Sequence, residues 1–248
     1  MAQACAPVPF LLVSAFTSNR DSGNPAAVVF LPSAGTSYPT EWLQAISKNL
    51  NQPITAFLSP LPELATAVTG TAVQADFAIR WFTIEAETPL CGHGTLAAAQ
   101  AIFTAPDLAG QLNGKFKENL KLNGDVPGEE GLLRFQTISG SIVSASKTTL
   151  IVPNSGSEVE RIQISFPHAP TVPISPTSQA GAKIRSALAK ALQKPAGDVD
   201  IAYMGHGEGP FDYYLLVELG GGERLDGREI VGDAFVRIAD FGFASCVI

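Results

Sequence analysis

Residues Leu90–Leu96 read Leu-Cys-Gly-His-Gly-Thr-Leu, and this stretch joins a strand-like segment to a helix-like one. Before it, Ala75–Thr83 has aromatic and β-branched residues in partial alternation, which favours a strand. After it, Thr95–Phe103 consists almost entirely of strong helix formers with apolar side chains, the composition of a helix enclosed by other elements. The sequence therefore predicts a strand, a glycine-rich turn and a buried central helix.

The turn carries a thiol and an imidazole, Cys91 and His93, at the expected start of this helix. A helix start has free N–H groups and partial positive charge, so it binds anions and lowers the pKa of a nearby thiol. We interpret Cys91 and His93 as candidate proton-transfer groups on this ground. The alternative, a turn with a buried cysteine and a hydrogen-bonded histidine, remains open on residue types alone.

The bulk composition excludes several classes of protein. With 248 residues, 46% hydrophobic and 16% charged, the chain is typical of a folded protein with a large core. A net charge of −7 without a Lys/Arg cluster argues against nucleic-acid binding, and no apolar run is long enough to span a membrane. The cysteines are too scattered for a disulfide framework or a metal site, so we expect a reducing, cytosolic setting and no metal: Cys5, Cys91 and Cys246.

The pattern along the chain predicts two α+β halves of related design. We expect a first domain over residues 1–105, a linker rich in Gly and Pro over residues 106–130, and a second domain over residues 131–248. Helices are predicted at Tyr38–Leu50, after Cys91, and at Ser178–Gln193. Strands are predicted at 10–17, 26–31, 54–58, 66–83, 132–135, 141–144, 148–152, 161–166, 199–203, 212–218 and 243–248.

Three segments occur in the order and spacing of one known family. Val13–Val29 contains Ala-Phe-Thr and Gly-Asn-Pro-Ala-Ala-Val-Val, Asn51–Phe57 reads Asn-Gln-Pro-Ile-Thr-Ala-Phe, and Ile79–Ala97 runs from Arg-Trp-Phe-Thr to Leu-Cys-Gly-His-Gly-Thr-Leu-Ala. They resemble the "DAFT...GNPAAVV", "NLSETAF" and "RWFTP...LCGHATLA" segments of the phenazine-biosynthesis PhzF-like proteins. The second half resembles the family more weakly, through Ile162–Pro167 and Asp212–Leu219.

This resemblance implies a diaminopimelate-epimerase-like fold of class α+β: two similar domains, each a strongly curved sheet wrapped around a central helix, with the active site in the cleft between them. Family members work without metal or organic cofactor and are commonly homodimers. The best understood is an isomerase that shifts a proton between carbons of a small carboxylated substrate. A cofactor-independent isomerase or epimerase of a biosynthetic process, cytoplasmic and homodimeric, is therefore the expected function.

The resemblance also suggests roles for individual residues. Cys91 lies where related epimerases carry the first of two catalytic cysteines, so we expect it to act as a thiolate base with His93 as acid or oxyanion partner. By analogy with the family, Gly23 and Asn24 help to line the pocket. Backbone N–H groups at the helix start are expected to hold the substrate carboxylate, namely those of Gly92, Gly94 and Thr95.

The chain departs from the family in two places. The acid/base of the family's isomerase is the glutamate of "NLSETAF", and this chain has Ile54 there. Family members also continue into a "GIxEDPVTGSAH" segment, so we expect a truncated product whose second domain lacks its central helix and exposes an apolar concavity. Glu85, Glu87 and Cys246 are candidate substitutes, although solvated carboxylates and a buried thiol are the ordinary alternatives. The second hypothesis is a catalytically inactive relative or fragment that binds a ligand or partner.

Overall fold

The computed structural model describes residues 7–17, 19, 22–32, 38–61, 74–112, 132–151, 156, 158–168, 170–212, 214–222 and 245–247. The chain divides into two compact units, Met1–Pro167 and His168–Ile248. This division lies later than the linker expected at 106–130, because strands from residues 132–165 belong to the sheet of the first unit. Within that expected linker, α3 (Pro106–Leu112) is a short helix, and residues 113–131 lie outside the described part of the chain.

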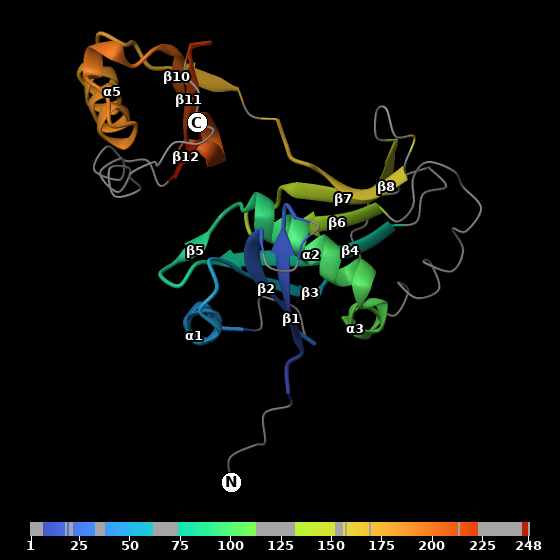
Figure 1. The fold of residues 1–248 in the computed structure, drawn as a ribbon. Helices are drawn as coiled ribbons and strands as arrows, with labels where there is room; N and C mark the ends of the chain where they lie inside the picture. The colour runs from blue at the N-terminus through green and yellow to red at the C-terminus, as the bar shows by residue number, and fades with distance from the viewer. Residues whose placement is uncertain are drawn as a thin grey trace. The chain divides into compact units, whose positions relative to one another are not determined.

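The first unit is built on one sheet with the strand order β1-β2-β3-β4-β6-β7-β8, and β5 pairs with β4 (Figure 1). The pairs β2–β3 and β4–β6 are parallel, and the others are antiparallel. The strands predicted at 141–144 and 148–152 form one continuous strand. The strand bounds are β1 (Phe10–Ala15), β2 (Asn24–Phe30), β3 (Thr55–Pro60), β4 (Gln74–Phe82), β5 (Glu87–Thr88), β6 (Leu132–Gln136), β7 (Ile142–Ile151) and β8 (Glu158–Ser165).

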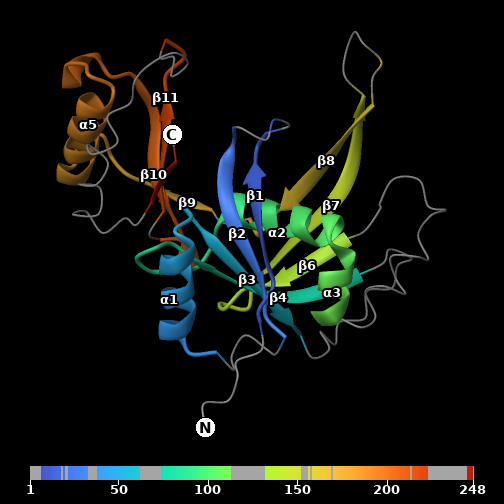
Figure 2. The ribbon, with the colours of Figure 1, turned by 60° about the horizontal axis from the view of Figure 1, so that its bottom comes forward.

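The sheet curls around the helix α2 (Gly92–Thr104), which contacts strands at both ends of the sheet order, β1 and β8, as well as β2, β3 and β7 (Figure 2). This arrangement explains the composition of the helix, because a helix that is covered on several sides needs apolar residues around most of its circumference. Ala98, Ala101 and Ile102 are each 0% exposed. The enclosed central helix predicted from the sequence is therefore confirmed.

On the opposite face of this sheet, α1 (Thr40–Leu50) packs against β3 and β4. Alternate side chains of β3 point to opposite faces, so Phe57 packs with Leu43 of α1 while its neighbour Ala56 packs on the α2 side. Asn51 ends α1 in the left-handed conformation with φ 49°, which asparagine tolerates better than most residues. β3 thus begins directly after α1, and Ile54 stands at this junction.

The second unit contains a four-stranded sheet of order β12-β11-β10-β9 and the helix α5 (Gln179–Ala191). Ser178 caps α5 by accepting a hydrogen bond from Gly181 N at 3.0 Å. Ile184 and Leu188 of α5 pack on one face of this sheet. The exposed concavity expected from the missing second central helix stays a prediction. The remaining elements are β9 (Thr171–Pro173), η2 (Ala196–Asp198), β10 (Ile201–Gly207), η3 (Gly209–Phe211), β11 (Tyr214–Leu219) and β12 (Ser245–Val247).

Neither unit offers a membrane-spanning helix: within the described ranges, every helix is too short or too polar to cross a bilayer.

Candidate active site

The candidate site lies in the turn that leads from β5 into α2. Cys91 is the residue just before the helix, with an extended backbone at φ −145° and ψ 114°, and α2 begins at Gly92. The Sγ atom of Cys91 lies 3.4 Å from Nδ1 of His93, within hydrogen-bond distance for sulfur. The structure therefore brings together the two proton-transfer groups predicted from the sequence.

The protonation of this pair is governed mainly by burial. Burial raises the pKa of the Cys91 thiol above its ordinary value of 9.0, although backbone N–H groups of Gly94 and His93 lower it in part. We expected the helix start to lower this pKa, but desolvation of the thiolate is the larger effect. Burial also lowers the pKa of His93 below 6.5. Near neutral pH the pair is thus a thiol beside a neutral imidazole.

Gly94 is the point where three other side chains meet. A Cβ at this position would lie 2.8 Å from Cδ1 of Trp81, and 3.3 Å from both Sγ of Cys91 and Cγ2 of Ile54. Carbon atoms do not approach to 2.8 Å without strain, so only glycine fits between α2 and the indole ring. Ile54, at the position of the family's glutamate, is 2% exposed and belongs to the core around α2.

Thr95 is fully buried and holds the turn together. Its backbone N–H and its hydroxyl group both donate to the carbonyl oxygen of Cys91, at 3.0 and 2.7 Å. The N–H group predicted to hold a carboxylate is thus engaged within the helix. Gly92 is half-buried, and a Cβ there would meet only the ring of Phe166, at 3.7 Å.

Gly23 and Asn24 lie at the start of β2. Gly23 has φ +95°, and a Cβ there would lie 2.5 Å from the carbonyl oxygen of Ala15, so the connection from β1 to β2 requires glycine. β2 runs parallel to β3 with Ala27 opposite Thr55. This register places Gly23 and Asn24 at the same end of the sheet as the residue before β3, which is Ile54.

Three residues were candidates from the sequence to replace the missing acid/base group: Glu85, Glu87 and Cys246. Glu87 forms a two-point ion pair with Arg80, with both N–O distances at 2.7 Å. Glu85 is exposed in the turn before β5. Cys246 belongs to β12, and its side chain lies outside the described residues. In the part of the chain that the structure describes, no group of three or more His, Cys, Asp or Glu side chains could share a metal ion.

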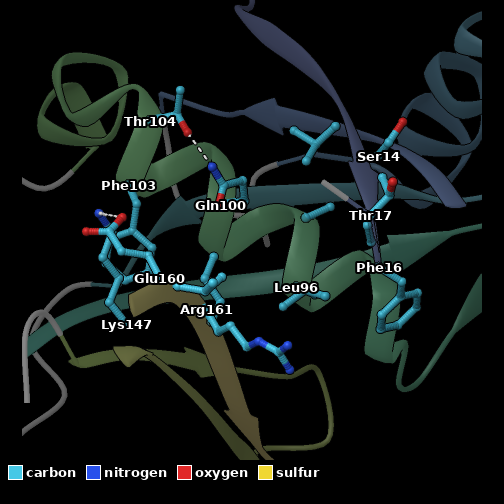
Figure 3. Close-up of a pocket in the computed structure, with 15 residues that line it drawn as sticks. Ser14, Phe16, Thr17, Leu96, Gln100, Phe103, Thr104, Lys147, Glu160 and Arg161 are labelled. Carbon is cyan, nitrogen blue, oxygen red and sulfur yellow. Dashed lines mark hydrogen bonds and ion pairs between the residues drawn. The ribbon is translucent and has the colours of Figure 1, made fainter. Parts of the chain in front are cut away.

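A groove of about 860 Å³, which was not predicted from the sequence, opens beside α2. Figure 3 shows that its lining comes from β1, α2, β7 and β8, with Leu96 and Gln100 of the helix in its floor. Lys147 reaches over the ring of Phe103, 5.3 Å from its centre, and lies 3.9 Å from a carboxylate oxygen of Glu160. The residues that line the groove are far apart in the sequence, so no local sequence pattern could have indicated the groove.

Comparison with known proteins identifies relatives of the chain. The family model of phenazine biosynthesis-like proteins, PhzC-PhzF, matches residues 13–206. The chain is 39% identical over 95 residues to an uncharacterized isomerase of Halalkalibacterium halodurans, covering 38% of this chain and 30% of the relative. It is 36% identical over 96 residues to the human phenazine biosynthesis-like domain-containing protein, covering 39% and 31%. The chain thus matches about a third of the length of these curated relatives.

A solved structure supports the same fold. A predicted epimerase from Pseudomonas aeruginosa superimposes with a TM-score of 0.57 at 21% identity, covering 96% of this chain and 68% of that one. At this identity the similarity shows the fold alone. It agrees with the α+β architecture of curved sheet and central helix described above.

Proposed function

Because the chain belongs to the family of phenazine biosynthesis-like proteins, we propose that it is a cofactor-independent isomerase or epimerase that moves a proton on a small carboxylated metabolite. The observation that carries this proposal is the distance of 3.4 Å between Cys91 Sγ and His93 Nδ1 at the start of α2. Two relatives that match the chain over 95 and 102 residues are named as isomerases. The whole-chain activity is proposed from that region and its chemistry.

Two neighbouring neutral groups suit proton transfer. Nδ1 of His93 accepts the proton of the Cys91 thiol and forms a thiolate–imidazolium pair, against the direction in which burial shifts both pKa values. The thiolate then removes a proton from a carbon of the substrate and becomes a thiol again. The imidazolium returns its proton to a second carbon on the same face of the substrate, so the protons balance without an external acid.

The start of α2 suits the anionic part of such a substrate. Partial positive charge at the helix start stabilises a carboxylate or the enolate that forms when the proton leaves. Gly92 is half-buried next to Cys91 in the sequence. Because glycine has no side chain, its backbone can be approached by a ligand from the Cβ side. We assign Gly23 and Asn24 to the rim of the same site, and Thr95 to holding the turn.

Hydrogen–deuterium exchange tests this function. The full chain is incubated in deuterated water with a panel of 2-amino and 2-hydroxy acids, and deuterium incorporation at carbon is followed by NMR. We expect exchange in one or more acids, with a loss of at least ~100-fold in Cys91→Ala, because general acid–base groups contribute factors of this order. If no acid exchanges, or if the variant exchanges as fast as the parent chain, this mechanism is wrong.

Ile54 favours a second candidate function, a binding protein without turnover. A buried isoleucine stands where the family's isomerase has its glutamate, so the carboxylate that moves the proton there is missing. This alternative predicts carboxylate binding without deuterium exchange, and binding that persists in Cys91→Ala. Calorimetric titration with the same acids separates the two functions.

The remaining expectations from the family concern assembly and location. We propose a homodimer that acts in the cytoplasm, in a biosynthetic process and without nucleic-acid or membrane partners. The net charge of −7 supports the absence of nucleic-acid binding. Sedimentation equilibrium of the full chain tests the dimer.

A further inference from the structure

Two side-chain nitrogens near the start of α2 are buried without a hydrogen-bond partner: Nε1 of Trp81 and Nε2 of His93. A buried N–H group without an acceptor is unfavourable, so folded proteins contain few of them. Within the described ranges the third buried atom of this kind is Oγ1 of Thr55. Thr55 neighbours Phe82 across the β3–β4 ladder, and Phe82 belongs to the core on the α1 side of the sheet. The two nitrogens are therefore a feature of the α2 side.

Trp81 presents the nitrogen-bearing edge of its indole ring to the helix start. Its side chain is 1% exposed, and its backbone lies in β4 between Ala56 of β3 and Thr88 of β5. Cδ1, the ring atom bonded to Nε1, would lie only 2.8 Å from a Cβ on Gly94. The absence of that Cβ lets the indole ring reach the first turn of α2.

Nε1 of Trp81 has no hydrogen-bond partner, and the three atoms nearest to the Cβ position on Gly94 include no oxygen. The same Cβ position on Gly94 lies 3.3 Å from a methyl carbon of Ile54 and 3.3 Å from the sulfur of Cys91. A methyl group accepts no hydrogen bond, and the sulfur is already near Nδ1 of His93 and backbone N–H groups. A neutral indole N–H can only donate, so its natural partner is an oxygen that comes from outside the chain.

The second unpartnered nitrogen points to the same chemistry. When the Cys91 thiol donates to Nδ1, the neutral imidazole of His93 carries its proton on Nε2. The helix start then has two unused side-chain donors and the partial positive charge of the α2 dipole. All three favour an anionic oxygen.

We propose that Trp81 is a ligand-binding residue of this site, and that its indole N–H donates to a carboxylate or enolate oxygen of the acid that binds at the start of α2. This inference rests on the proposed function for the location of the site, but not on turnover. It gives Trp81 a role that the motif around Cys91 does not reveal, because β4 precedes that motif in the sequence and reaches it only through the fold.

Indole NMR of the full chain tests the proposal, because the chain has only two tryptophans. The sample is labelled with ¹⁵N at the indole nitrogens and titrated with malonate, malate, glutamate and benzoate at constant ionic strength. Trp42→Phe assigns the two resonances. Trp42 is the internal control because it lies in α1 and stacks on Tyr38, which precedes the helix, with ring centres 5.2 Å apart. We expect the Trp81 resonance to move downfield and saturate with at least one acid, while that of Trp42 stays in place.

Trp81→Phe keeps a ring of similar size and removes the donor. We expect it to weaken binding of the responding acid by about 10- to 100-fold, the range for a hydrogen bond to a charged group. The ring protons of His93, assigned with His93→Gln, report separately on whether an acid reaches the helix start.

An acid that moves the His93 resonances but leaves the Trp81 resonance in place overturns this inference and leaves the proposed function intact. A panel that moves neither residue overturns the anion site itself. If Trp81→Phe does not fold, the titration of the parent chain still decides the question, since it needs only the Trp42→Phe assignment.

Discussion

Replacement of Gly94 by alanine tests the packing at the start of α2. The new Cβ would lie 2.8 Å from Cδ1 of Trp81, a contact that forces the indole ring or the helix to move. Overpacking of this kind costs about 1–3 kcal/mol. Gly92→Ala is the matched control, because its Cβ would make only an ordinary contact of 3.7 Å with the ring of Phe166. Both changes alter the backbone in the same helical turn, so their difference isolates the steric effect.

Denaturation in urea, followed by tryptophan fluorescence, measures this difference. Trp42 and Trp81 both lie in the unit Met1–Pro167, so the signal reports on the unit that contains the substitutions. We expect Gly92→Ala to be neutral or stabilised by up to about 1 kcal/mol, as for glycine-to-alanine changes at compatible positions. Gly94→Ala should be about 1–3 kcal/mol less stable than Gly92→Ala. Equal midpoints at equal slopes for the two variants would refute the contact between Gly94 and the indole ring.

Three further results are expected. The free energy of unfolding should fall as the pH rises above 9.0, because the pKa of Cys91 is raised in the fold, and Cys91→Ala should flatten this alkaline arm of the profile. It should also fall as the pH drops below 6.5, because the pKa of His93 is lowered, and His93→Gln should flatten this acidic arm. Asp76→Asn breaks the 2.6 Å ion pair with Arg134 that joins β4 and β6, and it should lower the free energy of unfolding in urea by about 1–3 kcal/mol. Glu160→Gln, at an exposed ion pair, should lower it by at most about 0.5 kcal/mol. Ile54→Glu should cost about 2–4 kcal/mol at neutral pH and less at pH 5, since a carboxyl group buried among apolar side chains has a raised pKa; equal losses at both pH values would contradict this burial.

The central helix could be predicted from the sequence because its signal is local. An almost uninterrupted apolar run after a glycine-rich turn is compatible with few positions other than the middle of a curved sheet. The boundary between the units could not be predicted in the same way. The composition changes after Phe103, but β6 pairs in parallel with β4 across more than fifty residues, so that Leu132 lies opposite Gln74. The change in composition therefore marks the segment between two paired strands of one sheet, and not the end of the sheet.

The electrostatics of the site also depend on contacts distant in sequence. The motif around Cys91 contains the features that lower a thiol pKa, namely a helix start and neighbouring N–H groups. The opposing effect comes from burial, and the core cluster against which Cys91 packs includes Ile54, thirty-seven positions earlier in the chain. The net direction of the shift is a property of the packed unit, and no reading of the motif alone could establish it.

Ile54 bears on the chemistry of the chain in both sequence and structure. It stands where the family's isomerase has its glutamate, so a carboxylate is missing, and it is a core residue that packs with α2. Near this residue, the indole N–H of Trp81 has no acceptor, and burial raises the pKa of the Cys91 thiol. The unpartnered N–H donor favours a ligand that brings an oxygen acceptor of its own. If the chain moves protons, Cys91 and His93 start the reaction as a thiol and a neutral imidazole, and the substrate supplies the carboxylate.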